Sequence, residues 1–409
     1  MTHSDREQII RNIERLVGEK FYDPTFGGKD WPGIVESHRQ LIMDAPDASR
    51  FENAVMLMFA EVGSSGLGLL GPQSTISPRN AINATFKKVD TAADGIRWVF
   101  QDVLPGGVAS RAGVRAADTL ISVNGSDIAP PEMPAFQMDR MIPIVASRNG
   151  ERKELRLQLA TPKPRYRDNP YAEPNSVTAR LEKPTLGHLR VGLFPGKLGI
   201  DFAKKVDAAF SGDLAPADRL LIDLRGNPGG GVGGLRLMSY LTPEKRPIGY
   251  SLDRATAESG YRRENLPRFN RIPSSKLEVP LLALRFARKK SVVLETEGLG
   301  KRAFHGRVVL LVNEHSTGAA EMVTQFAKEN RLAKIVGTKT PGRLVSRSAF
   351  AVGSGYQITI PIAAYLSWDG KQVEGKGIDP DMQVDWSYTE ALAGVDNQLS
   401  AALEIARGM

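Results

Sequence analysis

Hydrophobic and polar positions alternate differently in three stretches of the chain. In residues 1 to about 65, hydrophobic side chains recur every three or four positions, as at Ile9, Ile13 and Val17, which predicts amphipathic helices. Residues from about 70 to 162 carry short runs rich in β-forming residues, such as INATFKKV and GIRWVFQDV. From about residue 176 onward, strand-like and helix-like runs alternate, which is typical of an α/β layer, and a final helix is expected at about 389–407.

Glycine and proline clusters separate these stretches. Residues 63–72 are rich in glycine, and residues 161–175 contain four prolines and few apolar side chains, which predicts a linker. We therefore expect an N-terminal helical segment (1–65), a small β domain (70–162) and an α/β core (163–409). A basic insertion at about 243–300 interrupts the core. The predicted fold class is a mixed α+β and α/β multidomain protein.

Composition excludes several kinds of site. The 409 residues contain no cysteine, which rules out disulfides, thiolate catalysis and cysteine–zinc sites. The five histidines show no H-E-x-x-H spacing, so neither a metal nor a cofactor is predicted. No apolar run approaches the ~18 residues of a membrane span. The charged N-terminal stretch is not secretory, which predicts a cytoplasmic protein, or a periplasmic one if a leader has been removed.

Most of the net charge of +8 lies between Arg262 and Lys290, where nine Lys and Arg residues face only Glu264 and Glu278. Nucleic-acid binders usually combine such charge with stacking aromatic side chains, which are sparse here, so no nucleic acid is expected as a partner. Two interpretations stay open. The segment is a solvated basic face or flap, or it binds an acidic partner.

Residues 106–125, GGVASRAGVRAADTLISVNG, resemble the second half of a PDZ domain. Gly113 is placed to end a short helix, and Asn124-Gly125 predicts a tight hairpin turn. PDZ domains bind the C-termini of peptides at a sheet edge, and GLGL at 66–69 is similar to their carboxylate-binding loop but lies far from the rest. Alternatively, this PDZ-like domain only braces the core.

Residues 219–241, RLLIDLRGNPGGGVGGLRLMSYL, predict a strand, a glycine-rich loop and a helix. Three of the glycines match G-x-G-x-x-G, and Asp253 lies where a ribose-binding acid would be expected, so a dinucleotide site is one alternative. That fingerprint requires its first glycine directly after the strand, whereas residues 225–228 intervene here. The pattern therefore disfavours a dinucleotide site.

Four segments resemble the C-terminal processing (tail-specific) serine proteases, in the order that this family has them. They are FYDPTFGGKDWPGIVE, LLIDLRGNPGGG, GRVVLLVNEHSTGAAEMVTQFAKENRLAKIVGTKTPGR and DGKQVEGKGIDPDMQV. The resemblance implies a PDZ domain in front of an α/β protease core, serine-type peptidase activity, and a peptide or protein C-terminus as partner.

The same resemblance assigns catalytic positions. In this family the nucleophilic serine lies three residues before a glutamate that opens a helix, and the lysine base follows about 25 residues later. Here the glutamate is Glu321, the nucleophile position is Gly318 and the base position is Arg343. Glycine has no nucleophilic atom, and arginine stays protonated in proteins, so both halves of the dyad are missing.

Gly318 and Glu321 also have the spacing of the N-cap and N3 residues of a helix. Glycine at an N-cap costs only a few tenths of a kcal/mol, so loss of the serine is expected to damage the fold little. Some relatives use a histidine near the end of the N-terminal helices, and the matching position here is Gly66. That route is absent as well.

The remaining candidates lie beside these positions. Ser316 and Thr317 carry hydroxyl groups, and either is an alternative, rewired nucleophile. The resemblance assigns Gly229, Gly230 and Ala319 to the oxyanion and substrate site, where glycine lets the main chain approach the substrate. Alternatively, the glycines only allow tight packing.

The sequence thus predicts a weakened or non-catalytic relative that binds peptides or protein C-termini. The alternative is an active serine peptidase that uses Ser316 or Thr317, or one whose native serine was replaced.

Overall fold

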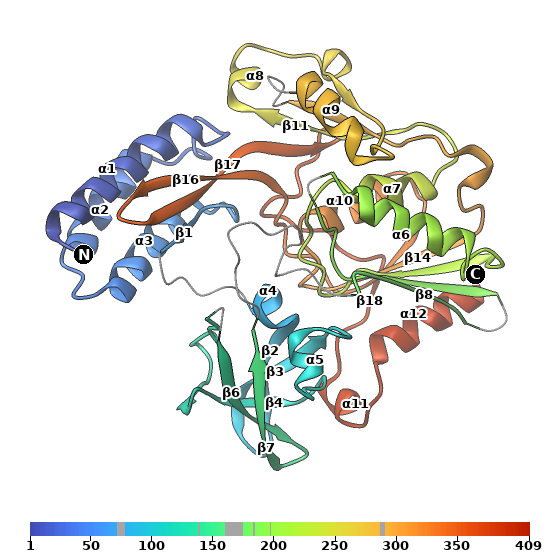
Figure 1. Ribbon diagram of the computed structural model, residues 1–409, viewed down its shortest axis with the longest axis horizontal. Helices are drawn as coiled ribbons and strands as arrows, with labels where there is room; N and C mark the ends of the chain where they lie inside the picture. Colours follow the sequence, from blue (N-terminus) through green and yellow to red (C-terminus); the bar gives the residue numbers. More distant parts are fainter. Residues whose placement is uncertain (72–77, 138–139, 160–174, 183–184, 197, 287–290) are drawn as a thin grey trace.

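The structure is a computed structural model, and it describes residues 1–71, 78–137, 140–159, 175–182, 185–196, 198–286 and 291–409. Three six-stranded sheets organise the chain, and helices cover their faces (Figure 1). The predicted mixed α/β fold class is confirmed. The predicted linker at 161–175 lies outside the described residues except for its last position. Among the described residues, no helix has the length and apolar character needed to cross a bilayer.

Three helices form the N-terminal lobe: α1 (His3–Lys20), α2 (Trp31–Met43) and α3 (Ala48–Val62). The side chains of Thr2 and Asp47 accept hydrogen bonds from main-chain N–H groups and so cap α1 and α3. The apolar faces of these helices pack on β16 (Val345–Gly353) and β17 (Tyr356–Ser367), two strands from the far end of the sequence. These strands therefore complete the core of the lobe.

The β domain is an antiparallel sheet with strand order β2-β3-β4-β6-β7, in which β5 pairs with β4. Its elements are α4 (Pro78–Ile82), β2 (Ala84–Thr91), β3 (Gly95–Val103), α5 (Val108–Arg111), β4 (Thr119–Val123), β5 (Ser126–Asp127), β6 (Met141–Arg148) and β7 (Glu151–Gln158). Phe86, Phe100, Leu120 and Leu157 lie in one buried cluster of this domain. The domain thus has a hydrophobic core of its own.

The central sheet of the core is parallel except at its edge strand β8. Its strands, in order, are β18 (Met382–Gln383), β15 (Lys334–Gly337), β14 (Arg307–Val312), β10 (Arg219–Asp223), β9 (Leu186–Val191) and β8 (Val177–Glu182). Helices α6 (Ile200–Ser211), α7 (Gly234–Tyr240) and α10 (Ala319–Glu329) cover one face. Helix α12 (Asn397–Gly408) covers the other, with α11 (Tyr388–Leu392) just before it. The expected final helix is thus interrupted at residues 393–396.

The third sheet has the order β1-β17-β11-β13-β12, and β16 pairs with β17. Its remaining strands are β1 (Gly68–Leu70), β11 (Pro247–Asp253), β12 (Arg268–Phe269) and β13 (Val292–Glu295). One end of β17 pairs with β1 and β16, and the other pairs with β11. This single strand therefore joins the N-terminal lobe to the core (Figure 1).

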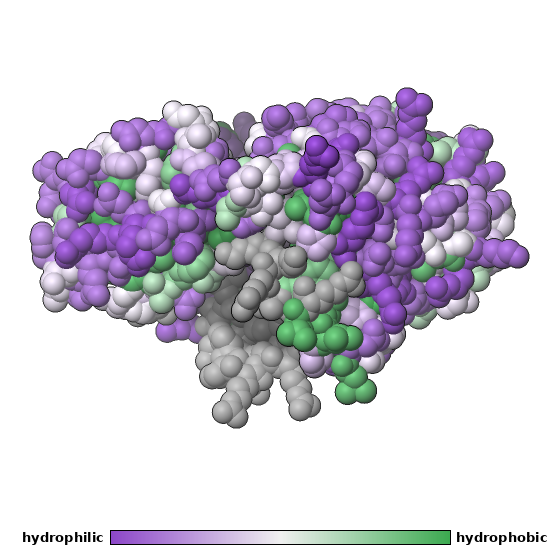
Figure 2. Space-filling model, turned by 90° about the horizontal axis from the view of Figure 1, so that it is seen from above, coloured by the Kyte–Doolittle hydropathy of each residue, from purple (hydrophilic) through white to green (hydrophobic). Residues whose placement is uncertain are grey.

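The basic insertion surrounds β12 and contains α8 (Arg254–Glu258), η1 (Arg263–Asn265), η2 (Lys276–Glu278) and α9 (Val279–Phe286); η3 (Gly300–Arg302) follows it. Several of its cations form ion pairs within the chain: Arg263 with Glu264, Arg268 with Glu295, Arg271 with Glu278 and Lys276 with Asp201. Arg288, Lys289 and Lys290 lie outside the described residues. Figure 2 views this end of the molecule, where most residues are hydrophilic and hydrophobic ones gather in one patch near the centre.

Candidate functional site

The turn that follows β14 spans residues 313–318 and leads directly into α10. Asn313 fixes its start, because its side-chain oxygen accepts a hydrogen bond from the N–H of Gly226 at 3.0 Å. Thr317 fixes its end, because its N–H donates to the carbonyl of Asn227 at 2.8 Å. The turn is therefore bound to the glycine-rich loop that follows the neighbouring strand, β10.

Gly318 has φ +58° and ψ −119°, a main-chain conformation that side chains other than that of glycine rarely adopt. A Cβ atom at this position would lie 3.5 Å from the Cα of Gly229 and 3.7 Å from the carbonyl oxygen of Pro228, both ordinary contacts. A serine therefore fits the space, but its main chain would be strained by about 1–3 kcal/mol. This corrects the expectation of a cost set by helix capping alone.

Glu321 ties Gly318 to Arg343. Its carboxylate is fully buried and accepts hydrogen bonds from the N–H of Gly318 (3.1 Å), the hydroxyl of Thr340 (2.8 Å), and the N–H groups of Gly342 (2.6 Å) and Arg343 (2.8 Å). Burial raises the pKa of Glu321, although these hydrogen bonds oppose the shift. The Gly318 N–H also lies 3.1 Å from the Arg343 carbonyl oxygen. The structure thus brings Gly318, Glu321 and Arg343 together.

The Arg343 side chain is exposed beside this turn. Within the described part of the chain, its guanidinium has no hydrogen-bond or ion-pair partner. It presents donors to solvent at the edge of the site, and it cannot accept a proton.

Ser316 does not fit the role of an alternative nucleophile. It is completely buried, its hydroxyl donates to the carbonyl of Leu224 at 2.8 Å, and the same oxygen accepts from the N–H of Asn313 at 2.9 Å. Thr317 differs, because it is half-buried and its hydroxyl has no partner among the described residues. Of the two alternatives that the sequence left open, the geometry leaves Thr317.

The three positions assigned to oxyanion binding are not equivalent. The N–H of Gly229 donates to the side-chain oxygen of Asn227 at 2.8 Å, so this amide is committed within its own loop. In the described part of the chain, the N–H groups of Gly230 and Ala319 have no acceptor. The N–H of Ala319 is one of those that the first turn of any helix leaves unpaired.

Gly230 is required by its contact with Phe194. The two residues form a parallel bridge, and a Cβ atom at Gly230 would lie 2.0 Å from the carbonyl oxygen of Phe194. At Gly229, a Cβ atom would lie 2.9 Å from the main-chain nitrogen of Ala319. The glycines therefore let this loop pack against both neighbouring main chains, and both roles considered from the sequence are compatible.

Glu374 was not singled out in the sequence, although it lies in one of the segments that carry the family resemblance. Its carboxylate accepts from the N–H and hydroxyl of Ser65 at 2.8 and 3.0 Å, and from the N–H of Leu344 at 2.8 Å. It thereby holds the turn that contains Gly66 beside the segment that follows Arg343. A Cβ atom at Gly66 would lie 2.8 Å from a methyl group of Val345, so the packing leaves no room for a histidine.

The β domain contacts the same turn. Glu314 forms an ion pair with Lys87 at 2.7 Å and accepts from the hydroxyl of Thr338 at 2.7 Å. Burial alone would raise the pKa of Glu314, but these two contacts outweigh it and lower the pKa to about 2. The carboxylate of Asp102 accepts from the Asn313 side chain at 3.0 Å. Within the described residues, no cluster of three His, Asp or Glu side chains could hold a metal ion.

Comparisons with known proteins concern the family and the fold. Residues 185–384 match the model of peptidase family S41. The chain is 24% identical over 93% of its length to putative tricorn protease homolog 2 of Streptomyces coelicolor, but spans only 31% of that protein. It is 20% identical over its full length to the carboxyl-terminal-processing protease of Synechocystis sp., of which it covers 88%.

Among solved structures, the photosystem II D1 C-terminal processing protease shares the fold, with a TM-score of 0.56 and 18% identity. The alignment covers 97% of this chain and 98% of that one. The match of residues 185–384 to peptidase family S41 and the carboxyl-terminal-processing relatives together support the tail-specific, C-terminal processing protease family, and the shared fold agrees with it.

Proposed function

We propose that this protein binds peptides or protein C-termini beside Gly318 and has lost most or all of the serine–lysine chemistry of its family. One observation carries the proposal. The main chain around Gly318 is held in place by Glu321, whereas neither Gly318 nor Arg343 can supply the nucleophile or the base.

The uncommitted groups at this site are hydrogen-bond donors, which suits them to bind the carbonyl or carboxylate oxygens of a peptide. The N–H groups of Gly230 and Ala319 and the guanidinium of Arg343 are uncommitted in the described part of the chain. A peptide carbonyl suits the two N–H groups, and a terminal carboxylate suits the guanidinium, because charge-assisted hydrogen bonds are the stronger ones. A free C-terminus therefore uses all three.

The proposed domain organisation is a helical segment (1–65), a PDZ-like domain (70–162) and a protease-like core (163–409). The contacts of Lys87 with Glu314 and of Asp102 with Asn313 support a bracing role for the PDZ-like domain. The ion pairs of the basic insertion favour a solvated face over a site for an acidic partner.

The second candidate is a peptidase that uses Thr317. Its hydroxyl is uncommitted and lies one residue before Gly318 in the same turn. Against it, a displacement of ~1 Å from the geometry that an oxyanion site requires can already lower the rate ~10²-fold.

A cleavage assay with an unstructured protein that has an apolar C-terminus tests the proposal. We expect no turnover by the wild type or by Thr317→Ala, and turnover by the double variant Gly318→Ser/Arg343→Lys. Wild-type turnover that Thr317→Ala abolishes would establish the second candidate instead.

Binding is tested separately by fluorescence anisotropy with a labelled peptide of the same C-terminal sequence. Arg343→Ala should weaken binding about tenfold, the effect of one charge-assisted hydrogen bond, and amidation of the peptide should do the same. Arg347→Ala is the matched control, since Arg347 is an exposed arginine on the neighbouring strand β16. Equal effects of the two substitutions would contradict a carboxylate contact with Arg343.

A further inference from the structure

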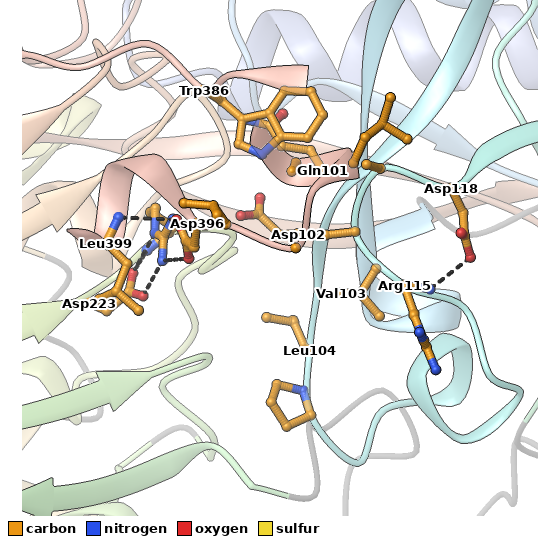
Figure 3. A pocket seen from close by; sticks show the side chains of 18 of the residues that line it. Gln101, Asp102, Val103, Leu104, Arg115, Asp118, Asp223, Trp386, Asp396 and Leu399 are labelled. Atoms are coloured by element: carbon orange, nitrogen blue, oxygen red, sulfur yellow. Dashed lines mark hydrogen bonds and ion pairs between the residues drawn. The ribbon is translucent and has the colours of Figure 1, made fainter. Parts of the chain in front are cut away.

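A cavity of about 480 Å³ lies where the β domain, the central sheet and the C-terminal segment meet (Figure 3). Its walls are the end of β3 with residues 103–105 and 115–118, the side chains of His188 and Asp223 on the central sheet, and residues 391–399. We refer to it as the junction cavity. It lies on the sheet face that α12 covers, whereas Gly318 lies at the start of α10 on the opposite face. Its volume is that of a small-molecule site.

Buried polar atoms without partners concentrate in this cavity. Six such side-chain atoms occur among the described residues, and three of them line the junction cavity: Gln101 Oε1, His188 Nδ1 and His188 Nε2. Gln101 is 3% exposed and His188 5% exposed. The nearest carboxylate to His188, that of Glu182, lies at 3.7 Å, too far for a hydrogen bond. Because buried polar groups are normally paired, these atoms indicate an occupant with both donors and acceptors.

Two of the arginines that line the cavity already form ion pairs within the protein. The Arg225 guanidinium pairs with Asp223 and Asp396, and Arg148 pairs with Asp118. These groups give the cavity rigid sides but leave little charge for a ligand to neutralise. Burial lowers the pKa of His188, so its ring is neutral and offers one N–H donor and one acceptor nitrogen.

The uncommitted charges are of opposite sign. The guanidinium of Arg115 is exposed and has no partner within the described part of the chain. The carboxylate of Asp102 accepts two protein hydrogen bonds, from Thr85 and Asn313, and has capacity for another donor. In Figure 3, Asp102 extends from β3 toward the side on which Asp223 and Asp396 lie. The cavity thus offers a site for an ammonium group and a separate one for a carboxylate.

The remaining walls are apolar and come from the C-terminal segment: Trp386, Leu392, Val395 and Leu399. The cavity thus has unpaired polar atoms, charged groups of both signs and apolar side chains. A molecule that matches all of them carries a free amino group, a free carboxylate, amide or amine N–H groups and an apolar side chain. Amino acids and short peptides have this combination.

We propose that the junction cavity binds a short peptide with free termini and an apolar side chain, at a site separate from the Gly318 turn. Its amino group faces Asp102, its carboxylate faces Arg115, and its polar backbone pairs with Gln101 and His188. This proposal does not depend on peptide binding at Gly318. A ligand here contacts Asp102, which in turn holds Asn313 at the start of the Gly318 turn.

The probe is the dipeptide Leu-Leu, and its uncharged control is N-acetyl-Leu-Leu amide. Isothermal titration of the full chain should give saturable binding of Leu-Leu at one site and binding at least tenfold weaker for the control, because two charged contacts are lost. No saturable binding of Leu-Leu up to about 10 mM would overturn the proposal and indicate that solvent alone fills the cavity.

Two variants assign the binding to this cavity. His188→Phe removes both unpaired nitrogens at similar volume, and Arg115→Ala removes the guanidinium at the surface. Each should weaken Leu-Leu binding about tenfold, whereas Arg111→Ala, an exposed arginine on α5, should not change it. If His188→Phe does not fold, the affinity of Arg115→Ala for Leu-Leu still tests whether the dipeptide binds in this cavity. Unchanged affinity in Arg115→Ala would overturn the proposal even if Leu-Leu binds elsewhere.

Discussion

The turn around Gly318 and the charge cluster around Arg225 follow neighbouring strands, β14 and β10. Their central residues differ in whether the main chain or the side chain makes the stabilising contacts. In the Gly318 turn, Thr317 and Gly318 themselves take part through their main-chain N–H groups, which donate to the carbonyls of Asn227 and Arg343, and Gly318 also donates to the Glu321 carboxylate. The Arg225 cluster is built from side chains, with Asp223 at 2.8 Å and Asp396 at 2.7 Å from the guanidinium.

This difference bears on the proposed loss of the catalytic serine. A main-chain hydrogen bond remains when the side chain changes, so on that proposal a glycine at position 318 leaves the turn intact. The Arg225 cluster has no such tolerance. Burial alone would raise the pKa of Asp223, but the charge and hydrogen bonds of Arg225 outweigh it and hold the pKa at about 2.

The largest expected effect comes from breaking the side-chain cluster. Arg225→Met leaves the carboxylate of Asp223 buried without its partner, and we expect a loss of about 3–5 kcal/mol in the free energy of unfolding. Urea denaturation measures it. Arg15→Met, which removes an exposed ion pair with Glu19, is the control and should cost less than about 0.5 kcal/mol. A loss below about 1 kcal/mol for Arg225→Met would mean that the cluster does not support the fold.

Two glycine substitutions compare positive-φ positions with and without a steric clash, since both Gly230 and Gly318 have a positive φ. Gly230→Ala places a Cβ atom against the carbonyl of Phe194 and should cost about 3 kcal/mol. Gly318→Ala meets no close contact and should cost only about 1–2 kcal/mol, from its positive φ. Thermal unfolding of the two variants ranks them. The reverse order would show that the space around Gly318 is tighter than its neighbours indicate.

Acid should weaken the contact between the β domain and the Gly318 turn. The folded-state pKa of Glu314 is lowered to about 2 from an ordinary 4.5, so its pairing stabilises the protein above pH 4.5 and is lost as the pH falls toward 2. We expect Glu314→Gln to cost about 1 kcal/mol at pH 7, after allowing for partial exposure, and the difference from wild type to shrink on acidification. Unfolding free energies between pH 7 and pH 3 measure this.

The control for acidification is Glu154→Gln, a substitution at an exposed position on β7. A difference between wild type and Glu314→Gln that stays constant with pH would contradict the assignment of the stabilisation to the Glu314 carboxylate.

The smallest effect on stability is expected at Arg343. Its side chain is exposed and unpaired within the described residues, so Arg343→Ala should change the free energy of unfolding by less than about 0.5 kcal/mol. Urea denaturation checks this, together with the peptide-binding assay above. A larger loss would show that the Arg343 guanidinium stabilises the fold through contacts of its side chain.

Features that depend on residues close together in the sequence could be predicted from it. The spacing from Gly318 to Glu321 places both in one strand–turn–helix unit, and the glutamate does bond to the N–H of Gly318. The sequence could not reveal the positive φ of Gly318, because a helix N-cap and a left-handed turn accept the same residue. Nor could it show that the hydroxyl of Ser316 is bound by Leu224, a residue far away in the chain.

Contacts between distant segments were the main omission. Glu374 joins the turn at Ser65 to the segment after Arg343, and no periodicity along the chain indicates such a pairing. The break in the expected final helix differs, because it has local signals: Gly394 has a positive φ, and Asp396 caps α12 while also binding Arg225. The Glu374 contacts are set by tertiary structure alone.

Strand β17 has a consequence for the order in which the protein can assemble during synthesis. Gly68 of β1 pairs with Thr359 of β17, roughly 290 residues later, and the N-terminal helices bury their apolar faces against the same strand. At about 5–20 residues per second, a ribosome needs on the order of 15–60 s to supply that strand. During this interval the helix faces that pack on this strand stay uncovered, which exposes this part of the nascent chain to aggregation.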